Sequence, residues 1–460
     1  MNDVPDLSLN TLCGLIRDRA LGPREVVDAY LERIEAADGV LNAYITVTAD
    51  EAQAQADESE RRHRQGAALG PLDGVPMALK DLIDVAGIVT SNGMAVRRDA
   101  IAETDAEVVR RLKAAGAVLL GKLNMHEAAM GASNDNVHFG RCHNPWAVGR
   151  TPGGSSGGAG AAVAGGLAAC ALGSDNMGSI RIPSAFCGIA GLKPTNDLVS
   201  TRGMVELSWS TGTVGPMTRG VDGVALLMSV LAGPDVENPR SRSALVTLDF
   251  ALPDEPALAG LKVGLPETFS TAPEPEVASA FEQALAVLSE LGAEFRPVEI
   301  EGLEHSRKAC LLIIESEAAV SYGVHMDDPA VAFAPDIRQQ LDYGRALSSA
   351  KLVDAFRTRG LLRRRVEAIF REVDVLVTPT TPCPAHSFDE AGPKELATYM
   401  ALANLCALPG LSVPMGCTEA GLPLGLQIMA APFRDPLVLR LGKAFEQRTD
   451  WHLRRSESRT

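Results

Sequence analysis

Two serines in glycine-rich turns stand out as groups that could act as nucleophiles. Ser155 lies in T-P-G-G-S-S-G-G at residues 151–158, and Ser179 ends the run D-N-M-G-S. Glycine permits the positive φ values of tight turns and lets backbone N–H groups approach a ligand closely. Residues 158–172 are mostly Ala, Gly and Val, which is typical of a buried helix. Two serines at opposite ends of one buried element predict an active site.

A lysine at the end of an apolar strand is the candidate base. Lys80 follows a predicted strand at residues 75–79, and Leu82 and Ile83 come soon after it. Most lysines are solvated charges, but apolar neighbours on both sides favour burial here. Burial lowers the pKa of an amine, so that its neutral form can accept a proton. A lysine is one known partner for activating a serine hydroxyl.

A phosphate-binding, dinucleotide-binding or metal site fits the residues of the glycine turn less well than a serine nucleophile does. No lysine follows Gly158, as a phosphate-binding loop requires, and the spacing of a dinucleotide-binding turn is also absent. Ser179 does not lie in a G-x-S-x-G turn, and the sequence assigns no histidine partner to either serine. The chain has no H-E-x-x-H pair, so we expect no metal. His126, His138 and His143 are expected to fill loops.

The combination of Lys80, Ser155 and Ser179 resembles the amidase signature family of serine hydrolases. The resemblance spans essentially the whole chain, and the spacings among the three residues also fit. It implies that Ser179 is the nucleophile, that Ser155, in a cis peptide, is the intermediary, and that neutral Lys80 is the final base. The matching motifs are P-L-D-G-V-P-M-A-L-K-D, N-P-W, T-P-G-G-S-S-G-G, G-S-I-R-I-P-S-A-F-C-G, G-L-K-P-T, G-P-M-T-R and G-L-P-L-G-L-Q.

The same resemblance implies which groups surround the nucleophile. Backbone N–H groups of its turn would form the oxyanion hole, and Met177 stands where the family commonly has a glycine. A methionine there adds an apolar, flexible side chain beside the scissile carbonyl. Ser156 and Ser174 are expected to hydrogen-bond the loop, while Asp175 and Arg181 are expected to hold the turn by charge-assisted bonds. The predicted oxyanion-hole residues are Asn176, Met177, Gly178 and Ser179.

Alternating helical and strand patterns predict an α/β fold. With the resemblance, we expect the amidase signature fold, a large mixed twisted β-sheet sandwiched between α-helices, in a single domain over residues 1–460. Residues 1–66 are predicted to be an N-terminal helical segment, 71–230 the core that carries the signature, and 301–373 a helical segment that shapes the pocket. Residues 203–219 are expected to form a loop.

The composition favours a small-molecule partner. The 43 basic and 58 acidic residues give a formal net charge of −15, which disfavours nucleic acid and anionic membranes as partners. The first residues do not resemble a signal peptide, and no apolar run is long enough to span a membrane. The 8 cysteines form no C-x-x-C pair and are expected to be reduced. We therefore expect a cytoplasmic protein without a cofactor. The sequence leaves open whether the chain forms a homodimer.

The residues and the resemblance together predict hydrolysis of an amide, or a related C–N bond, through an acyl-enzyme on Ser179. Hydrolysis of a carbamate or a urea by the same three residues is an alternative. A glutamine-dependent amidotransferase subunit of the A type, which serves mischarged tRNA within a complex, would share the fold. Members of that branch usually have Gln where this chain has Ile182, so it is less favoured. An inactive binding protein is disfavoured by the intact lysine and serines.

Overall fold

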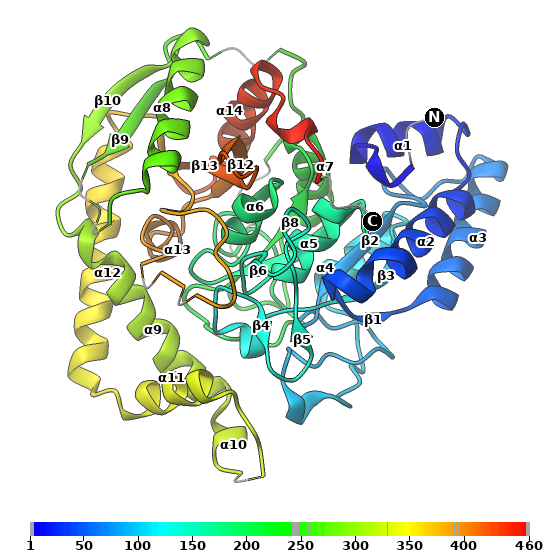
Figure 1. Ribbon diagram of the computed structural model, residues 1–460, viewed down its shortest axis with the longest axis horizontal. Coiled ribbons are helices and arrows are strands. Elements are labelled where there is room, and N and C mark those ends of the chain that lie inside the picture. Colours follow the sequence, from blue (N-terminus) through cyan, green and yellow to red (C-terminus); the bar gives the residue numbers. More distant parts are fainter. Residues whose placement is uncertain are drawn as a thin grey trace.

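An eleven-stranded mixed β-sheet is the central element of the residues that the structure describes (Figure 1). The computed structural model describes residues 4–241, 248–255, 258–267, 269, 271–328, 330–390, 392–393 and 395–456. The strand order is β1-β3-β2-β6-β8-β7-β12-β13-β11-β9-β10. Pairing is parallel for β2–β3, β2–β6, β9–β10 and β9–β11, and antiparallel elsewhere. The strands are β1 Tyr44–Val47, β2 Pro76–Lys80, β3 Val118–Leu123, β6 Cys170–Asp175, β7 Ala190–Lys193, β8 Thr213–Thr218, β9 Lys262–Pro266, β10 Glu294–Val298, β11 Val375–Pro379, β12 Gly410–Cys417 and β13 Pro423–Ala430, with a separate small pair β4 Asp135–Asn136 and β5 Gly140–Arg141.

Helices cover both faces of this sheet, as the alternation of side chains along β12 shows. Leu411 points toward α14, where a Cβ on Gly442 would lie 2.5 Å from its side chain. Ser412 points to the other face, where a Cβ on Gly425 would lie 2.9 Å from Ser412 Oγ and 2.6 Å from Ala185 of α6. The prediction of a mixed sheet between helices is therefore confirmed. The helices are α1 Leu9–Arg17, α2 Pro23–Leu41, α3 Ala49–Gln65, α4 Glu107–Ala114, α5 Gly157–Gly165, α6 Arg181–Cys187, α7 Val221–Leu231, α8 Pro275–Glu290, α9 Ser306–Ser321, α10 Gly323–Met326, α11 Pro335–Ala346, α12 Ser349–Ile369, α13 Ala401–Leu405 and α14 Asp435–Arg448.

Two of the predicted elements are wrong in part. The small-residue run 158–172 is not one helix, because α5 ends where Gly166 turns the chain with a φ of 76°, and β6 begins at Cys170. The predicted loop 203–219 contains strand β8, which pairs with both β6 and β7. Segments made of Ala, Gly, Thr and Pro have little contrast between apolar and polar positions. Their periodicity therefore does not separate helix from strand.

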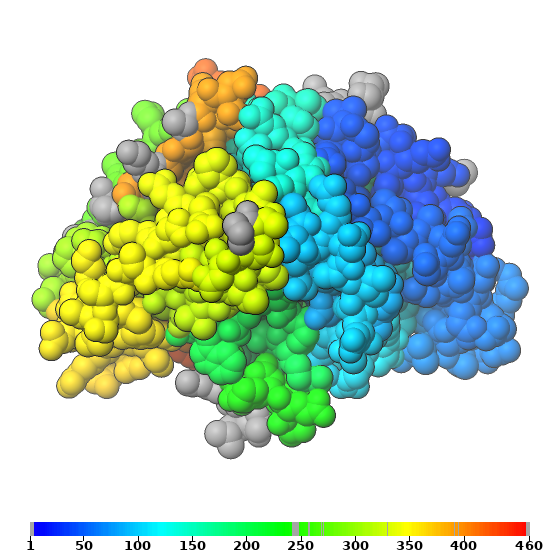
Figure 2. All heavy atoms as spheres, turned by 90° about the horizontal axis from the view of Figure 1, so that it is seen from below, coloured from blue at the N-terminus to red at the C-terminus, as the bar shows by residue number. Residues whose placement is uncertain are grey.

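The helices α9, α11 and α12, with the short η5 Leu303–His305, form the region 301–373 that was expected to be helical. Figure 2 shows the yellow part of this region lying against the cyan part of the chain. The hydrogen bonds that join them include Ala334 N–H to Glu127 Oε2 at 2.9 Å, Tyr322 Oη to the Ala128 carbonyl at 3.0 Å and Gln340 Nε2 to the Met130 carbonyl at 3.4 Å. The helical region therefore lies beside the loop that leads to the first serine turn.

Candidate active site

Lys80 ends a strand that is buried along its whole length. Strand β2 lies between β3 and β6, and the Lys80 side chain is 0% exposed. Its Nζ lies 2.7 Å from Ser155 Oγ and 2.9 Å from Ser174 Oγ. Burial holds the pKa of Lys80 well below its usual value, although Asp175 acts to raise it. The expected burial of this lysine is confirmed, and the geometry favours a neutral amine in contact with two hydroxyl groups.

Ser155 is held in a turn that has no room for larger residues. Its peptide bond to Gly154 is cis, and a Cβ on Gly154 would lie 2.9 Å from the backbone of Ala132. The Ser155 carbonyl accepts a hydrogen bond from the N–H of His126 at 3.1 Å. Ser156 donates through Oγ to the Ser174 carbonyl at 3.1 Å and accepts from the Ser174 N–H at 3.2 Å. These bonds fix the turn against the end of β6.

Ser179 lies in the turn between β6 and α6. Gly178, at a φ of 112°, allows this turn, and a Cβ there would lie 2.4 Å from Met400 Sδ. Ser156 N–H donates to the Ser179 carbonyl at 3.3 Å, so the two serine turns are joined directly. The Ser179 residue is 9% exposed and lines a cavity. The structure therefore brings together the lysine and both serines that the sequence singled out.

Asp175 and Arg181 hold the nucleophile turn from behind. Both side chains are 0% exposed, and two bonds of 3.0 Å join them. Burial alone would raise the pKa of Asp175, but the Arg181 guanidinium holds it well below its usual range. Asp175 also accepts from the Gly178 N–H at 2.6 Å and the Ile180 N–H at 3.2 Å. The pair therefore fixes the backbone on both sides of Ser179.

The N–H groups of the same turn differ in their availability to a substrate. Gly178 N–H is occupied by the Asp175 carboxylate at 2.6 Å. Within the part of the chain that the structure describes, the N–H groups of Asn176, Met177 and Ser179 have no hydrogen-bond acceptor. Met177 does not lie in the left-handed region, so a non-glycine residue fits this position. Of the four predicted oxyanion-hole donors, the N–H groups of Asn176, Met177 and Ser179 therefore remain candidates, and that of Gly178 does not.

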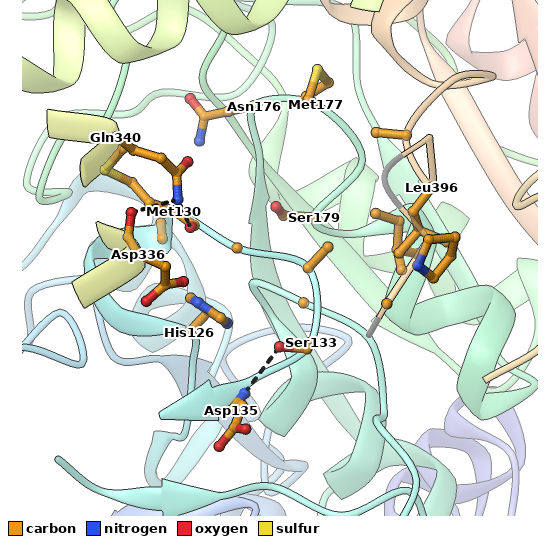
Figure 3. Close-up of a pocket in the computed structure, with 18 of the residues that line it drawn as sticks. His126, Met130, Ser133, Asp135, Asn176, Met177, Ser179, Asp336, Gln340 and Leu396 are labelled. Carbon is orange, nitrogen blue, oxygen red and sulfur yellow. Dashed lines mark hydrogen bonds between the residues drawn. The ribbon is translucent and has the colours of Figure 1, made fainter. Parts of the chain in front are cut away.

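Ser179 opens into a cavity of about 420 Å³ that is lined by both polar and apolar side chains. Figure 3 shows His126, Asp336 and Gln340 on one side of Ser179 and Leu396 on the other. The amide nitrogen of Asn176 points into the space between Gln340 and Ser179 (Figure 3). The apolar lining residues include Met130, Met177, Ile182, Leu207, Leu311, Ile314, Phe388 and Leu396.

Burial shifts the pKa of several ionisable groups in this cavity, among them Glu315, His126 and His386. It raises the pKa of Glu315, on α9, to about 7, although Arg307 acts to lower it. It lowers the pKa of His126, whose Nδ1 is buried and has no hydrogen-bond partner among the described residues. His126 was expected to fill a loop, but the structure places it in the cavity wall beside Ser179. Its ring is therefore a neutral polar group facing the site.

The other two histidines of this region have structural contacts. His138 Nε2 lies 3.0 Å from Glu127 Oε1, and His143 Nδ1 accepts from the Gly149 N–H at 3.2 Å. Among the described residues, no group of three or more His, Cys, Asp or Glu side chains could hold a metal ion. Within the same residues, no helix is both long enough and apolar enough to cross a membrane.

Three residues that position the site have a role that the sequence did not predict. Ser174 was expected only to bond the loop, but its Oγ contacts Lys80 at 2.9 Å. Asn404 Oδ1 and Gln427 Oε1 each accept from Arg181 at 2.7 Å. Gln427 ends the motif G-L-P-L-G-L-Q, so a signal for it was present. Asn404 belongs to no quoted motif and could be found only from the fold.

Comparisons with known proteins agree on one family. A family model for amidases matches residues 25–439. The A subunit of the glutamyl-tRNA(Gln) amidotransferase of Moorella thermoacetica is 40% identical, over 98% of this chain and 98% of that protein. A solved structure described as "An unexpected vestigial protein complex reveals the evolutionary origins of an s-triazine catabolic enzyme" has a TM-score of 0.90 at 33% identity, covering 96% of this chain and 98% of that one. A bacterial aryl acylamidase has a TM-score of 0.89 at 28% identity, covering 97% of each chain.

The fold is that of an enzyme class that acts on C–N bonds. The chain belongs to the amidase signature family.

Proposed function

We propose that this protein hydrolyses a carboxylic amide, or a related C–N bond, through an acyl-enzyme on Ser179. The observation that carries the proposal is the 2.7 Å contact between the buried Lys80 amine and Ser155 Oγ, beside the nucleophile turn. A neutral amine has one lone pair, which can accept the Ser155 proton. Ser155, as both donor and acceptor, can then receive the proton of Ser179. With a neutral amine and two hydroxyl groups, no charged group has to form in the buried site before the substrate binds.

In the proposed mechanism, Ser179 Oγ attacks the substrate carbonyl while its proton passes through Ser155 to Lys80. The resulting oxyanion accepts hydrogen bonds from backbone N–H groups of Asn176, Met177 and Ser179. Such a donor is worth about 2.7–4 kcal/mol of transition-state stabilisation. The leaving nitrogen takes the proton back as the C–N bond breaks. Water then attacks the acyl-enzyme through the same relay and releases the acid.

The cavity supports a substrate that has polar groups on one side of the scissile bond. Its volume of about 420 Å³ suits a small molecule. The Asn176 amide nitrogen offers a donor and the His126 ring a further polar contact. His126 Nδ1 is buried without a partner among the described residues, which costs about 1–3 kcal/mol. A substrate that bonds to this nitrogen removes this cost. A polar amide fits this description, and so does a urea or a carbamate.

A second candidate is the role named for the Moorella relative, the A subunit of a glutamyl-tRNA(Gln) amidotransferase. The 40% identity over nearly the whole chain favours it. Two observations count against it. Ile182 gives the cavity an apolar side chain where a glutamine was expected for that branch. The net charge of −15 opposes direct contact with tRNA. The first step at Ser179 would be the same in both cases.

The two candidates differ in what the purified chain does alone. We would incubate it with glutamine and with a panel of amides, anilides, carbamates and ureas, and measure the release of ammonia or amine. Turnover of a substrate other than glutamine, absent in Ser179→Ala, is the expected result. If only glutamine is hydrolysed and the chain co-purifies with partner subunits, the second candidate is correct. Light scattering of the same sample tests the open question of a homodimer.

A further inference from the structure

A second cavity, of about 360 Å³, lies away from Ser179 and shares no lining residue with the active-site cavity. Arg359 and Arg363 of α12 line it, together with Trp209 and Ser210. The two arginines are one helical turn apart, so they present their guanidinium groups to the same side of α12. The cavity therefore has a positively charged wall.

Neither of these two arginines forms an ion pair among the described residues. Arg359 Nε donates to the Leu405 carbonyl at 3.1 Å and its Nη2 donates to the Ser210 carbonyl at 3.2 Å, and both acceptors are neutral. Within the described ranges, Arg363 makes no ion pair and no hydrogen bond, although it lines the cavity. Burial, followed by the charge of Arg363, lowers the pKa of Arg359. Two guanidinium groups that repel each other in a partly buried site favour a bound anion.

Two acidic groups near the cavity accept hydrogen bonds from other donors. Glu317 of α9 acts on Arg359, but its carboxylate accepts from Ser208 Oγ and, at 2.9 Å, from the Ser210 N–H. Asp197 pairs with Arg240 at 3.0 Å. Among the described residues, neither of these two carboxylates is hydrogen-bonded to Arg359 or Arg363.

The backbone around this cavity is held in an uncommon conformation. Asp197, Ala407 and Phe433 all line it, and their φ values are 68°, 59° and 65°. Left-handed residues other than glycine cost free energy and gather at ligand sites. Trp209 is 51% exposed beside them, and Arg240 lies 5.5 Å from its ring. An exposed indole offers a flat apolar surface to the body of a ligand.

We propose that this cavity is a second binding site, for a small organic anion. Its carboxylate or phosphate group is held between Arg359 and Arg363, and its planar body rests on Trp209. Guanidinium groups bind both kinds of oxyanion in the same fork geometry. The proposal does not depend on the reaction at Ser179.

Isothermal titration with benzoate and with phenyl phosphate, at constant ionic strength, tests the site. We compare the wild type with Arg363→Ala and with the matched control Arg364→Ala, which removes an exposed arginine next in the chain. At least one probe should bind saturably, with Arg363→Ala weakening binding at least tenfold and Arg364→Ala less than twofold. Binding of benzoate alone indicates a carboxylate ligand, and binding of phenyl phosphate alone indicates a phosphate ligand.

Two results would overturn the proposal. One is the absence of saturable binding by either probe, and the other is equal binding by the two variants. Equal binding by Arg363→Ala and Arg364→Ala is also the result expected if benzoate binds at Ser179, as a product analogue, instead of in the second cavity. Labelling of Ser179 by a fluorophosphonate at the wild-type rate establishes that each variant is folded. Arg363→Gln serves in place of Arg363→Ala if the latter does not fold.

Discussion

Replacing Ser174 with alanine would remove one of the two hydroxyl groups that contact the Lys80 amine. Nζ donates to Ser174 Oγ at 2.9 Å, and Lys80 is fully buried, so water does not replace the lost acceptor. Ser174 does not touch the reacting atoms in this arrangement. We therefore expect it to act as a positioning residue, with effects on both the orientation of the amine and its pKa.

The size of both effects follows from the change in hydrogen bonding. A bond to a neutral group contributes about 0.5–1.5 kcal/mol and one to a charged group about 1.5–3 kcal/mol, so the loss disfavours the ammonium by about 1 kcal/mol more than the amine. At 1.36 kcal/mol per unit, this lowers the pKa of Lys80 by roughly 0.7–1 unit. The hydrogen bond from the neutral Lys80 amine to Ser174 also orients the amine. Its loss should lower the pH-independent value of kcat/KM by about two- to tenfold.

The assay is kcat/KM as a function of pH, which reports the pKa values of the free enzyme. In Ser174→Ala, the acid limb should move to lower pH while the plateau falls. Ser156→Ala is the matched control, since Ser156 Oγ bonds only to the backbone of Ser174 and not to Lys80. An acid limb that stays in place or moves to higher pH would refute the reasoning. An equal shift in Ser156→Ala would do the same.

Four further predictions concern other parts of the molecule. Ser179→Ala should abolish turnover and fluorophosphonate labelling without unfolding the protein, and labelling at another serine would contradict the assignment. Met177→Gly should change the ratio of kcat/KM between small and bulky substrates by about 10–200-fold, because Met177 lines the cavity; an unchanged ranking would make it structural only. Burial raises the pKa of Glu446 to about 8, so wild-type stability should fall as pH rises from about 4.5 through 8, and the Tm advantage of Glu446→Gln should grow over that range. EDTA should leave turnover unchanged, since no group of candidate metal ligands occurs in the described residues; activity lost to EDTA and restored by zinc would contradict this.

The sequence was sufficient where the signal is local. An apolar strand before Lys80 predicted its burial, and glycines on either side of the serines predicted their turns. The alternation of elements predicted an α/β fold, and the resemblance to the amidase signature family implied the mixed sheet between helices. The assigned roles of the lysine and the serines stay predictions until variants are measured.

The rest depends on contacts between residues far apart in the chain. Asn404 and Gln427 lie 223 and 246 residues from Arg181 in the sequence, and nothing in their immediate neighbourhood indicates that partner. His126 faces the cavity only because the loop before the first serine turn packs beside α11. In such cases the tertiary fold, and not local propensity, decides the neighbour of a side chain.

The order of strands has a consequence for how this protein is made. Strand β7 pairs with β8 on one side and with β12 on the other, so its second edge has no partner until the last strands leave the ribosome. Until then the nascent chain carries both serine turns and the lysine, but the groups that complete the Arg181 network have not been synthesised. An unpaired strand edge is a risk for aggregation during this interval. The network that holds the nucleophile turn is therefore complete only after Gln427 has been synthesised, and a chain that stops before Asn404 lacks both of these partners of Arg181.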